Sequence, residues 1–526
     1  MLARVQSYLL EGIDALPCEV EVDLNESDIR REMIVGLPDA SVKESIERVK
    51  AALTNSGFSL PWGNLLINLA PADVRKEGNV YDLPIAIGQL MVLGSVPTGA
   101  SPLRPHKPSG VAERPAPQQS EPLDPRHYLF AGELALDGRL RPIKGAIALA
   151  ALAKSRGFRG VFVPADNAPE ASVVPDIDVI GVRTLSEAVA MLCGRLEPAV
   201  HPPLDIAAML RSAPAPIDFV EVRGQESVKR ALTIAAAGGH NILMLGPAGT
   251  GKTMMAKALP GILPPLSAEE AIEITRIYSA AGMLPPGQGL ISTRPVRTPH
   301  HTASAPAVVG GGMVPRPGEI SLAHHGVLFL DELAEFPRMV LETLRQPMED
   351  HVVTIARAHA ALKFPASFQL VAAMNPTPKG DLTPGEVGRR EMERYLAKIS
   401  GPLLDRIDIH VEAPAVPFTQ LAKAKPGTST AMMRERVNAA RARQHARQGG
   451  TPNCRLSGKL LDQFAPLSEE SQALLGQALT EMGLSARAYD KIRRVARTIA
   501  DVDECDAVRV EHIAEAVSYR LLDRKV

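Results

Sequence analysis

Hydrophobic and polar positions alternate differently in successive parts of the chain, and the first part mixes strands with helices. The segments EVEVDL (19–24) and LLINLAP (65–71) have the alternating or apolar runs of strands. SVKESIERVKAALTNSG (41–57) has the spacing of an amphipathic helix that ends at Gly57. Residues 129–167 predict a hairpin around Asp137 and Gly138, then a helix and a strand. We therefore expect an α+β domain here.

From residue 220 onward, short apolar strands alternate with helices. The strands NILML (241–245), VLFL (327–330), FQLVAA (368–373) and IDIHVEA (407–413) predict a parallel αβα sheet. From about residue 456 the pattern is helical, and three amphipathic helices fit 468–482, 486–500 and 507–522. The fold class is therefore α/β with a helical C-terminal region.

Two proline-rich breaks suggest how the chain divides into domains. Residues 97–125 lack apolar periodicity and predict a disordered insert within a first domain, 1–196. Residues 197–219 predict a linker. The α/β core then occupies 220–412, a linker with an arginine-rich, exposed helix occupies 413–455, and a helical lid occupies 456–526. A chain of 526 residues is long enough for several such cores.

The composition mainly excludes certain classes of protein. The formal net charge is -1, so any contact with nucleic acid must come from local basic patches. The 4 cysteines form no CxxC pair, which favours reduced thiols over a zinc site or a disulfide framework. The N-terminus has no signal-peptide pattern, and no apolar stretch is long enough to span a membrane. We expect a cytoplasmic protein with no membrane partner.

A phosphate-binding loop follows the strand 241–245 and precedes a helix. Its sequence matches GxxxxGK[ST] in full. Glycines let backbone N–H groups turn toward phosphate oxygens, and the helix N-terminus adds its positive dipole end. We expect the lysine to reach the β- and γ-phosphates of ATP and the last hydroxyl to bind Mg2+. The residues are Gly246, Pro247, Ala248, Gly249, Thr250, Gly251, Lys252 and Thr253.

Two later strands end in polar residues that complete such a site. The apolar strand 327–330 leads into Asp331 and Glu332, a Walker B motif. Asp331 is predicted to hold Mg2+, and Glu332 to polarise the attacking water. The strand 368–374 ends at Asn375, which suits a sensor of the γ-phosphate. Parallel strands bring these carboxyl ends to one edge of the sheet.

Longer segments carry a family resemblance. They are residues 223–267 around the phosphate loop, TPHHTASAPAVVGGG (298–312), RPGEISLAHHGVLFLDELAEF (316–336), LETLRQPMEDHVVTI (341–355), ISGPLLDRIDIHVE (399–412) and LSARAYDKIRRVARTIAD (484–501). In the first domain they are GLPDASVKESIERVKAAL (36–53), INLAPADVRKEG (67–78) and FAGELALDGRLRPIKGA (130–146). Together they resemble the ComM/YifB-type, magnesium-chelatase-like AAA+ proteins over nearly the whole chain. The resemblance implies an AAA+ P-loop core, a Lon-protease-like first domain with the fold of ribosomal S5 domain 2, and a helical lid.

The resemblance also implies roles that spacing alone does not give. Arg406 is similar to the arginine finger that reaches a neighbouring subunit, and Arg487 to the sensor-2 arginine of the lid. Such cations stabilise charge on the γ-phosphoryl group. An arginine finger requires a homo-oligomer, and the usual assembly of the family is a hexameric ring.

The chain differs in two places from the family that it resembles. Many relatives carry a cysteine cluster after the sensor asparagine, whereas NPTPKGDL (375–382) has none. In the Lon-like domain, RKEGNVYDLPIAIG (75–88) contains no serine, and Lys144 precedes Gly145 rather than taking the place of the protease lysine. A Ser–Lys dyad, and hence proteolysis, is not supported.

Two inserts are candidates for contact with DNA. VVTIARAHAALKFPA (352–366) predicts a hairpin whose turn is Ala358–Ala360, and the resemblance points it into a ring pore. Phosphate contacts there would come from Arg357, His359 and Lys363, although an ordinary solvated hairpin fits equally well. The second insert carries His300 and His301. His324 and His325, by contrast, suit packing or capping of a turn.

Four functions are compatible with these features. The first is a DNA helicase or translocase that promotes branch migration in recombination and natural transformation. The second is a chelatase-like ATPase that remodels a protein partner. A protease and an inactive scaffold are disfavoured by the absent dyad and by the complete set of ATP-site residues.

Overall fold

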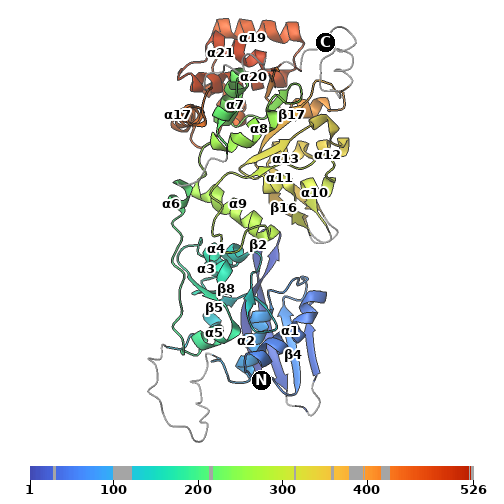
Figure 1. The fold of residues 1–526 in the computed structure, drawn as a ribbon, viewed down its shortest axis with the longest axis vertical. Helices are drawn as coiled ribbons and strands as arrows, with labels where there is room; N and C mark the ends of the chain where they lie inside the picture. Colours follow the sequence, from blue (N-terminus) through green and yellow to red (C-terminus); the bar gives the residue numbers. More distant parts are fainter. Residues whose placement is uncertain are drawn as a thin grey trace. The chain divides into compact units, whose positions relative to one another are not determined.

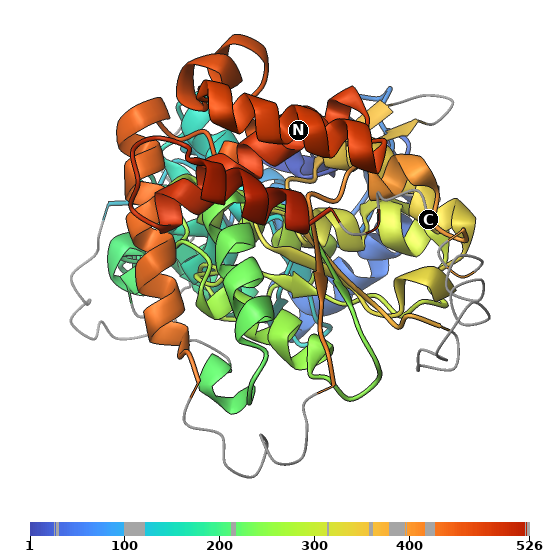
Figure 2. The ribbon, with the colours of Figure 1, turned by 90° about the horizontal axis from the view of Figure 1, so that it is seen from above.

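The computed structural model describes residues 1–25, 27, 31–98, 121–211, 217–312, 315–356, 361–377, 395, 397–415, 427–520 and 522. The chain forms two compact units (Figures 1 and 2). The first comprises Met1–Met209 and Ala271–Ile291, and the second Leu210–Glu270 and Ser292–Val526. The predicted insert lies mostly outside the described residues.

A seven-stranded sheet forms the centre of the first unit, in the order β3-β4-β2-β1-β5-β8-β9. β1 and β2 form an antiparallel hairpin, and β3 runs parallel to β4. The strands are β1 (Leu2–Glu11), β2 (Asp14–Asn25), β3 (Arg31–Val35), β4 (Asn64–Ala70), β5 (Tyr128–Phe130), β8 (Gly160–Pro164) and β9 (Asp178–Val182). The small hairpin of β6 (Glu133–Leu134) and β7 (Leu140–Arg141) confirms the turn predicted at Asp137 and Gly138.

Helices bury the apolar faces of this sheet. One core packs α1 (Ala40–Asn55), α2 (Asp82–Val92) and α5 (Leu185–Leu192) against the strands. A second core, under α3 (Ala146–Arg156) and α4 (Ala168–Ala171), includes Tyr8 and Val161. The predicted helix ending at Gly57 is α1, and it begins where the Asp39 carboxylate accepts the Val42 N–H at 2.8 Å.

The second unit contains an all-parallel sheet of five strands, in the order β11-β14-β17-β10-β18. Their carboxyl ends therefore meet at one edge. The strands are β11 (Val296–Arg297), β14 (Val327–Leu330), β17 (Gln369–Met374), β10 (Ile242–Leu245) and β18 (Ile409–Glu412). Residues on β10, β14 and β17 are buried throughout, as continuous apolar runs require. The predicted αβα class is confirmed.

The C-terminal helices pack around α7 (Glu226–Gly238) within the same unit, and Figure 2 shows them in orange and red. Ser468 and Ser485 cap two of them. The helices are α17 (Thr430–Gln448), α18 (Gly458–Phe464), α19 (Glu469–Met482), α20 (Ala486–Val502) and α21 (Val510–Ser518). Of these, α19, α20 and α21 match the three predicted helices to within a few residues at each end.

The arginine-rich helix α17 is not the solvated basic surface that its sequence suggested. Arg434 donates to the Gly261 carbonyl at 2.6 Å, and Arg447 binds the buried carboxylate of Asp501 at 2.7 Å. Burial lowers the pKa of the Arg441 guanidinium. Arg434 and Arg447 thus hold the helix to its neighbours, so the prediction of an exposed basic face is wrong for these two arginines.

Residues 271–291 belong to the first unit, although the sequence pattern placed them in the ATPase core. Helix α9 (Ala268–Ala281) thus contributes its first turn to the second unit and the rest to the first. In the first unit, Ser279 donates to the buried Glu170 carboxylate and accepts the Gly145 N–H at 2.8 Å. Within the described ranges, no helix is long and apolar enough to cross a membrane.

Candidate functional site

The phosphate loop connects β10 to α8 (Lys252–Ala258) at the carboxyl edge of the parallel sheet. Gly249 and Gly251 have φ values of 80° and 85°, which side-chain-bearing residues rarely adopt. A Cβ at Gly246 would lie 2.1 Å from the Ala413 carbonyl oxygen, so only glycine lets the loop leave the sheet here. The glycines therefore have the positions that the motif requires.

The Lys252 side chain lies inside this loop. Its ammonium donates to the Gly246 and Pro247 carbonyls, both at 2.7 Å, and contacts Asn375 Oδ1 at 3.3 Å. Burial lowers the pKa of Lys252, and the nearby Asp331 carboxylate opposes that shift. A desolvated ammonium of this kind interacts more strongly with a phosphate anion than an exposed one would.

The predicted metal ligands lie next to each other. Thr253 Oγ1 donates to Asp331 Oδ2 at 2.7 Å. A hydroxyl and a carboxylate so close together are the oxygen ligands that Mg2+ prefers, with nucleotide phosphates and water completing its shell. The structure thus brings together Lys252, Thr253, Asp331 and Asn375, and the loop, the helix start and the oxygen pair fit ATP with Mg2+.

Glu332 is also at this edge, in an unusual backbone conformation. Its φ and ψ are 53° and 50°, a left-handed region that costs a non-glycine residue roughly 1–3 kcal/mol. Its Oε2 lies 3.2 Å from Nδ1 of His301, which belongs to the loop after β11. The structure therefore places His301, predicted as a DNA contact, against the predicted catalytic carboxylate.

Arg406 lies at the other edge of the sheet. It precedes β18, and Asn241, which precedes β10, donates to its carbonyl oxygen at 3.1 Å. A strand of four residues spans roughly 13 Å, so this arginine is remote from Lys252 of its own chain. Arg406 pairs with Glu349 and also donates to the Pro402 carbonyl at 2.6 Å.

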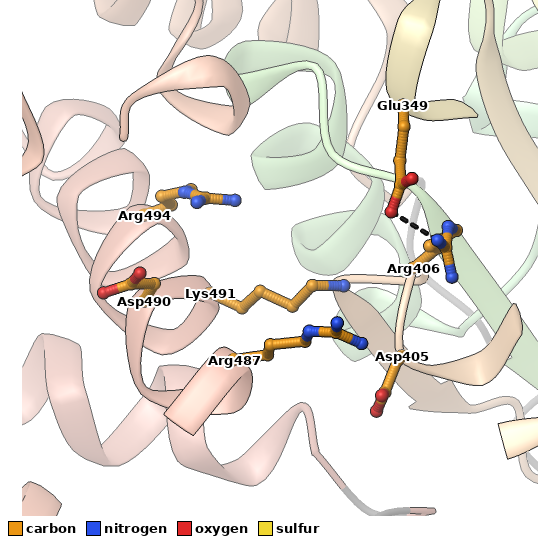
Figure 3. A pocket seen from close by; sticks show the side chains of 7 residues that line it. All are labelled: Glu349, Asp405, Arg406, Arg487, Asp490, Lys491 and Arg494. Carbon is orange, nitrogen blue, oxygen red and sulfur yellow. Dashed lines mark hydrogen bonds and ion pairs between the residues drawn. The ribbon is translucent and has the colours of Figure 1, made fainter. Parts of the chain in front are cut away.

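A cationic pocket of about 230 Å³ surrounds Arg406 (Figure 3). Arg487 lines it, together with two cations that the sequence reading overlooked, Lys491 and Arg494. These three residues follow a spacing of four and three along α20, so a helical projection from Arg487 would have found them. The acidic lining residues are Glu349, Asp405 and Asp490.

Asp408 binds Lys491, one of the residues that line the pocket. Its carboxylate lies 3.2 Å from Lys491 Nζ and 3.3 Å from His240 Nδ1. Burial alone would raise the pKa of Asp408, but Lys491 and His240 hold it well below its ordinary value. The anion thus holds Lys491, whereas Arg487 is exposed.

The predicted hairpin insert is confirmed as β15 (Val352–Ala356) paired with β16 (Ala361–Pro365). Lys363 is exposed on β16, opposite Thr354. Arg357, His359 and the predicted turn lie outside the described residues. In the other insert, His300 is exposed and its Nδ1 lies 2.8 Å from the Thr302 hydroxyl.

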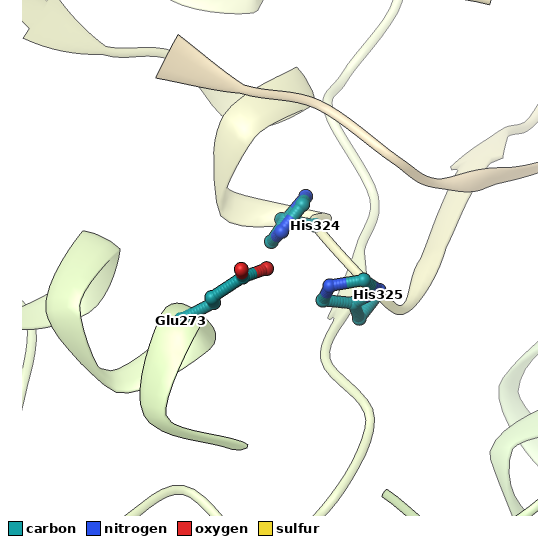
Figure 4. Close-up of side chains that lie close together, drawn as sticks. All are labelled: Glu273, His324 and His325. Carbon is teal, nitrogen blue, oxygen red and sulfur yellow. The ribbon is translucent and has the colours of Figure 1, made fainter. Parts of the chain in front are cut away.

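His324 and His325 have packing and capping roles, as expected. Their rings lie 3.9 Å apart (Figure 4). His324 Nδ1 accepts the Ser367 N–H at 3.0 Å, and His325 Nδ1 lies 3.4 Å from Glu270. Glu273, also drawn in Figure 4, belongs to the other unit.

Comparison with known proteins agrees with this geometry. The family model "Magnesium chelatase, subunit ChlI" matches residues 218–421, its C-terminal counterpart matches 427–520, and "Subunit ChlI of Mg-chelatase" matches 20–102 and 112–167. YifB of Escherichia coli is 43% identical over 527 residues, covering 99% of this chain and 98% of its own. The chain belongs to the ComM/YifB-type family of magnesium-chelatase-like AAA+ ATPases.

The chain is also similar to two further proteins. Competence protein ComM of Haemophilus influenzae is 41% identical over 535 residues, covering 99% of this chain and 98% of its own. The magnesium-chelatase 38 kDa subunit of Rhodobacter capsulatus is 28% identical over 184 residues, which cover 32% of this chain and 52% of its own. Nucleotide and Mg2+ use are general properties of this family of ATPases.

Proposed function

We propose that the chain is a cytoplasmic, ATP-driven DNA motor that assembles as a hexameric ring and promotes branch migration in homologous recombination and natural transformation. One observation carries the proposal. The nucleotide-binding cluster, which comprises Lys252, Thr253, Asp331 and Asn375, lies at one edge of the sheet, and the cationic pocket around Arg406 lies at the opposite edge. Each is therefore half of a site that a second copy completes. A competence protein among the relatives of similar length supports the choice of DNA.

Within one subunit, each residue of the cluster has a distinct task. Lys252 and the loop N–H groups bind the phosphates, and Thr253 with Asp331 holds the metal. Bound Mg2+ supplies charge neutralisation at the phosphate oxygens. Asn375, fixed by Lys252, orients the attacking water, and Glu332 accepts its proton.

A neighbouring subunit supplies the remaining cations. Arg406 and Arg487 cannot serve the ATP of their own chain, because they line a pocket at the far edge of the sheet. In a ring, that pocket faces the phosphate loop of the next subunit, where the guanidinium groups stabilise charge on the γ-phosphoryl group. Arg487 of the helical lid thus acts on the adjacent subunit together with Arg406, the arginine finger.

The inserts are the best candidates for the DNA contact. The β15–β16 hairpin and the loop with His300 extend from the same unit as the ATP site. Exposed Lys363 and His300 provide donors for backbone phosphates, and such contacts do not depend on sequence. This fits a motor that acts on DNA of any sequence.

A chelatase-like ATPase that remodels a protein partner is the alternative. The similarity to the 38 kDa subunit of magnesium chelatase favours it, although that similarity covers only 32% of the chain. The two functions differ in what stimulates hydrolysis.

ATP hydrolysis by the full chain, measured with and without single-stranded or forked DNA, distinguishes them. We expect DNA to raise the rate and Glu332→Gln to abolish it. If hydrolysis is equally fast with every DNA, the DNA motor is excluded in favour of the protein-directed function.

A further inference from the structure

The two arginines proposed to act on a neighbouring ATP come from distant parts of the chain, yet both line one pocket. Arg406 begins the finger segment, residues 406–408, which leads into β18, and Arg487 lies in the first turn of α20. Two cations that act on one phosphoryl group must keep a fixed separation, because misplacement by about 1 Å can lower a rate about 100-fold. That separation depends on how α20 is held against the finger segment.

The backbone of the finger segment is held at each of its residues. The Asn241 amide donates to the Arg406 carbonyl at 3.1 Å, and the Asn241 carbonyl accepts the Asp408 N–H at 3.0 Å. Arg520 donates to the Ile407 carbonyl, which lies between them, at 2.6 Å. A displacement of Asp408 is therefore transmitted to Arg406.

A buried ion pair is the first link between the finger segment and α20. Lys491 Nζ lies 3.2 Å from Asp408 Oδ1, and only 12% and 11% of the two side chains are exposed. Solvent ions screen such a pair much less than a surface salt bridge. Lys491 follows Arg487 by one helical turn, so the two side chains project from the same face of α20, as Figure 3 shows.

The other carboxylate oxygen of Asp408 forms a second link to α20. Asp408 Oδ2 lies 3.3 Å from Nδ1 of His240, and Nε2 of the same ring lies 2.8 Å from the hydroxyl of Thr498. Both His240 and Thr498 are fully buried. Thr498 follows Lys491 by two helical turns, which is about 10 Å along the axis. A helix held at one point can pivot about it, whereas a helix held at two points keeps its direction.

We propose that Asp408 is a positioning residue that fixes α20 relative to the finger segment, so that Arg406 and Arg487 reach one γ-phosphoryl group together. The inference rests on the proposed function. It deepens that function by naming the group that keeps the two cations of the shared site at a constant separation. Asp408 acts only through the residues that its carboxylate binds.

The first test is ATP hydrolysis by Thr498→Val, because Thr498 is buried and is not among the residues that line the pocket. We expect kcat to fall about tenfold with KM for ATP unchanged, since the phosphate loop is intact while the cations lose their arrangement. Thr498→Ser keeps the hydroxyl and the original rate. Ser471→Ala removes another buried hydroxyl of the lid, on α19, and is the matched control with an unchanged rate. If Thr498→Val is as active as Ser471→Ala, or if only its KM changes, the proposal is overturned.

The second test mixes variants to show which half of the shared site is damaged. Asp408→Asn weakens both links, so we expect its kcat to fall about 100-fold. Mixed with Lys252→Ala it regains activity, because the second variant supplies an ordered finger and lid. Mixed with Arg406→Ala it stays inactive, because neither variant supplies them. Recovery with Arg406→Ala, or with neither variant, overturns the proposal. If circular dichroism shows that Asp408→Asn is unfolded, Thr498→Val takes its place in the mixtures.

A reference mixture of Lys252→Ala with Arg406→Ala separates this inference from the proposed function. If the reference mixture stays inactive, subunits do not share a site and the proposed ring fails. The kcat of unmixed Thr498→Val, compared with Thr498→Ser and Ser471→Ala, still decides whether the links position the two arginines, because that comparison needs no mixing.

Discussion

The buried ion cluster around Asp501 gives the most specific stability prediction. Its carboxylate is fully buried and binds Arg447 at 2.7 and 2.9 Å, Arg497 at 2.9 Å and the Asn453 amide at 2.8 Å. Two guanidinium groups thus share one anion at the junction of α17 and α20. The cluster therefore joins the arginine-rich helix α17 to α20.

Asp501→Asn preserves the shape of the side chain but removes the charge and turns one acceptor into a donor. That donor faces the donor groups of Asn453 and Arg447. Breaking a buried pair by removing one partner costs about 3–5 kcal/mol. At roughly 2 °C per kcal/mol for a unit of this size, we expect Tm to fall by roughly 6–10 °C.

Differential scanning calorimetry of the full chain measures the shift. A non-hydrolysable ATP analogue identifies the transition of the second unit, because a ligand of the folded state raises its Tm. Asp506→Asn is the matched control, since Asp506 is 98% exposed in its pair with Arg443 and its loss costs under about 1 kcal/mol. If the two variants melt at the same temperature, Asp501 does not hold α17 to α20.

Four further predictions follow from the site and its surroundings. Lys252→Ala abolishes binding of a fluorescent ATP analogue, since the loop loses its desolvated cation. Lys252→Ala and Arg406→Ala are each inactive, yet a mixture of the two hydrolyses ATP, because one supplies the intact loop and the other the intact finger; a mixture that remains inactive refutes a shared site. Because Asp408 has a lowered pKa in the folded chain, it stabilises the fold at neutral pH, and this contribution declines as the pH falls below about 4 toward the folded pKa. In urea titrations at decreasing pH, the free energy of unfolding therefore falls less steeply for Asp408→Asn than for the unaltered chain. Burial raises the pKa of the Cys18 thiol to about 12, so Ellman's reagent at pH 8 modifies it only after unfolding.

The nucleotide-binding cluster was predictable because its residues are local in sequence or directly follow strands. Lys252 and Thr253 lie in one contiguous motif, and Asp331 and Asn375 each end a buried apolar run. Parallel pairing then brings them together without further information. The starts of α19 and α20 were equally predictable, because each depends on a local cap, Ser468 or Ser485.

Features that depend on distant partners were not predictable in the same way. The sequence of α17 does not reveal that its arginines bind Asp501 and the Gly261 carbonyl, because these partners are distant along the chain. The contact of His301 with Glu332 depends on β11 and β14 being neighbours. The transfer of residues 271–291 to the first unit depends on Ser279 reaching Glu170, a pairing without any local signal.

Branch migration of a synthetic four-way junction tests the central claim most directly. The junction is incubated with the full chain and ATP, and the products are resolved by electrophoresis, with Glu332→Gln in parallel. The account predicts conversion to duplex products by the unaltered chain and none by the variant. Undiminished ATP hydrolysis with an unmoved junction would contradict it.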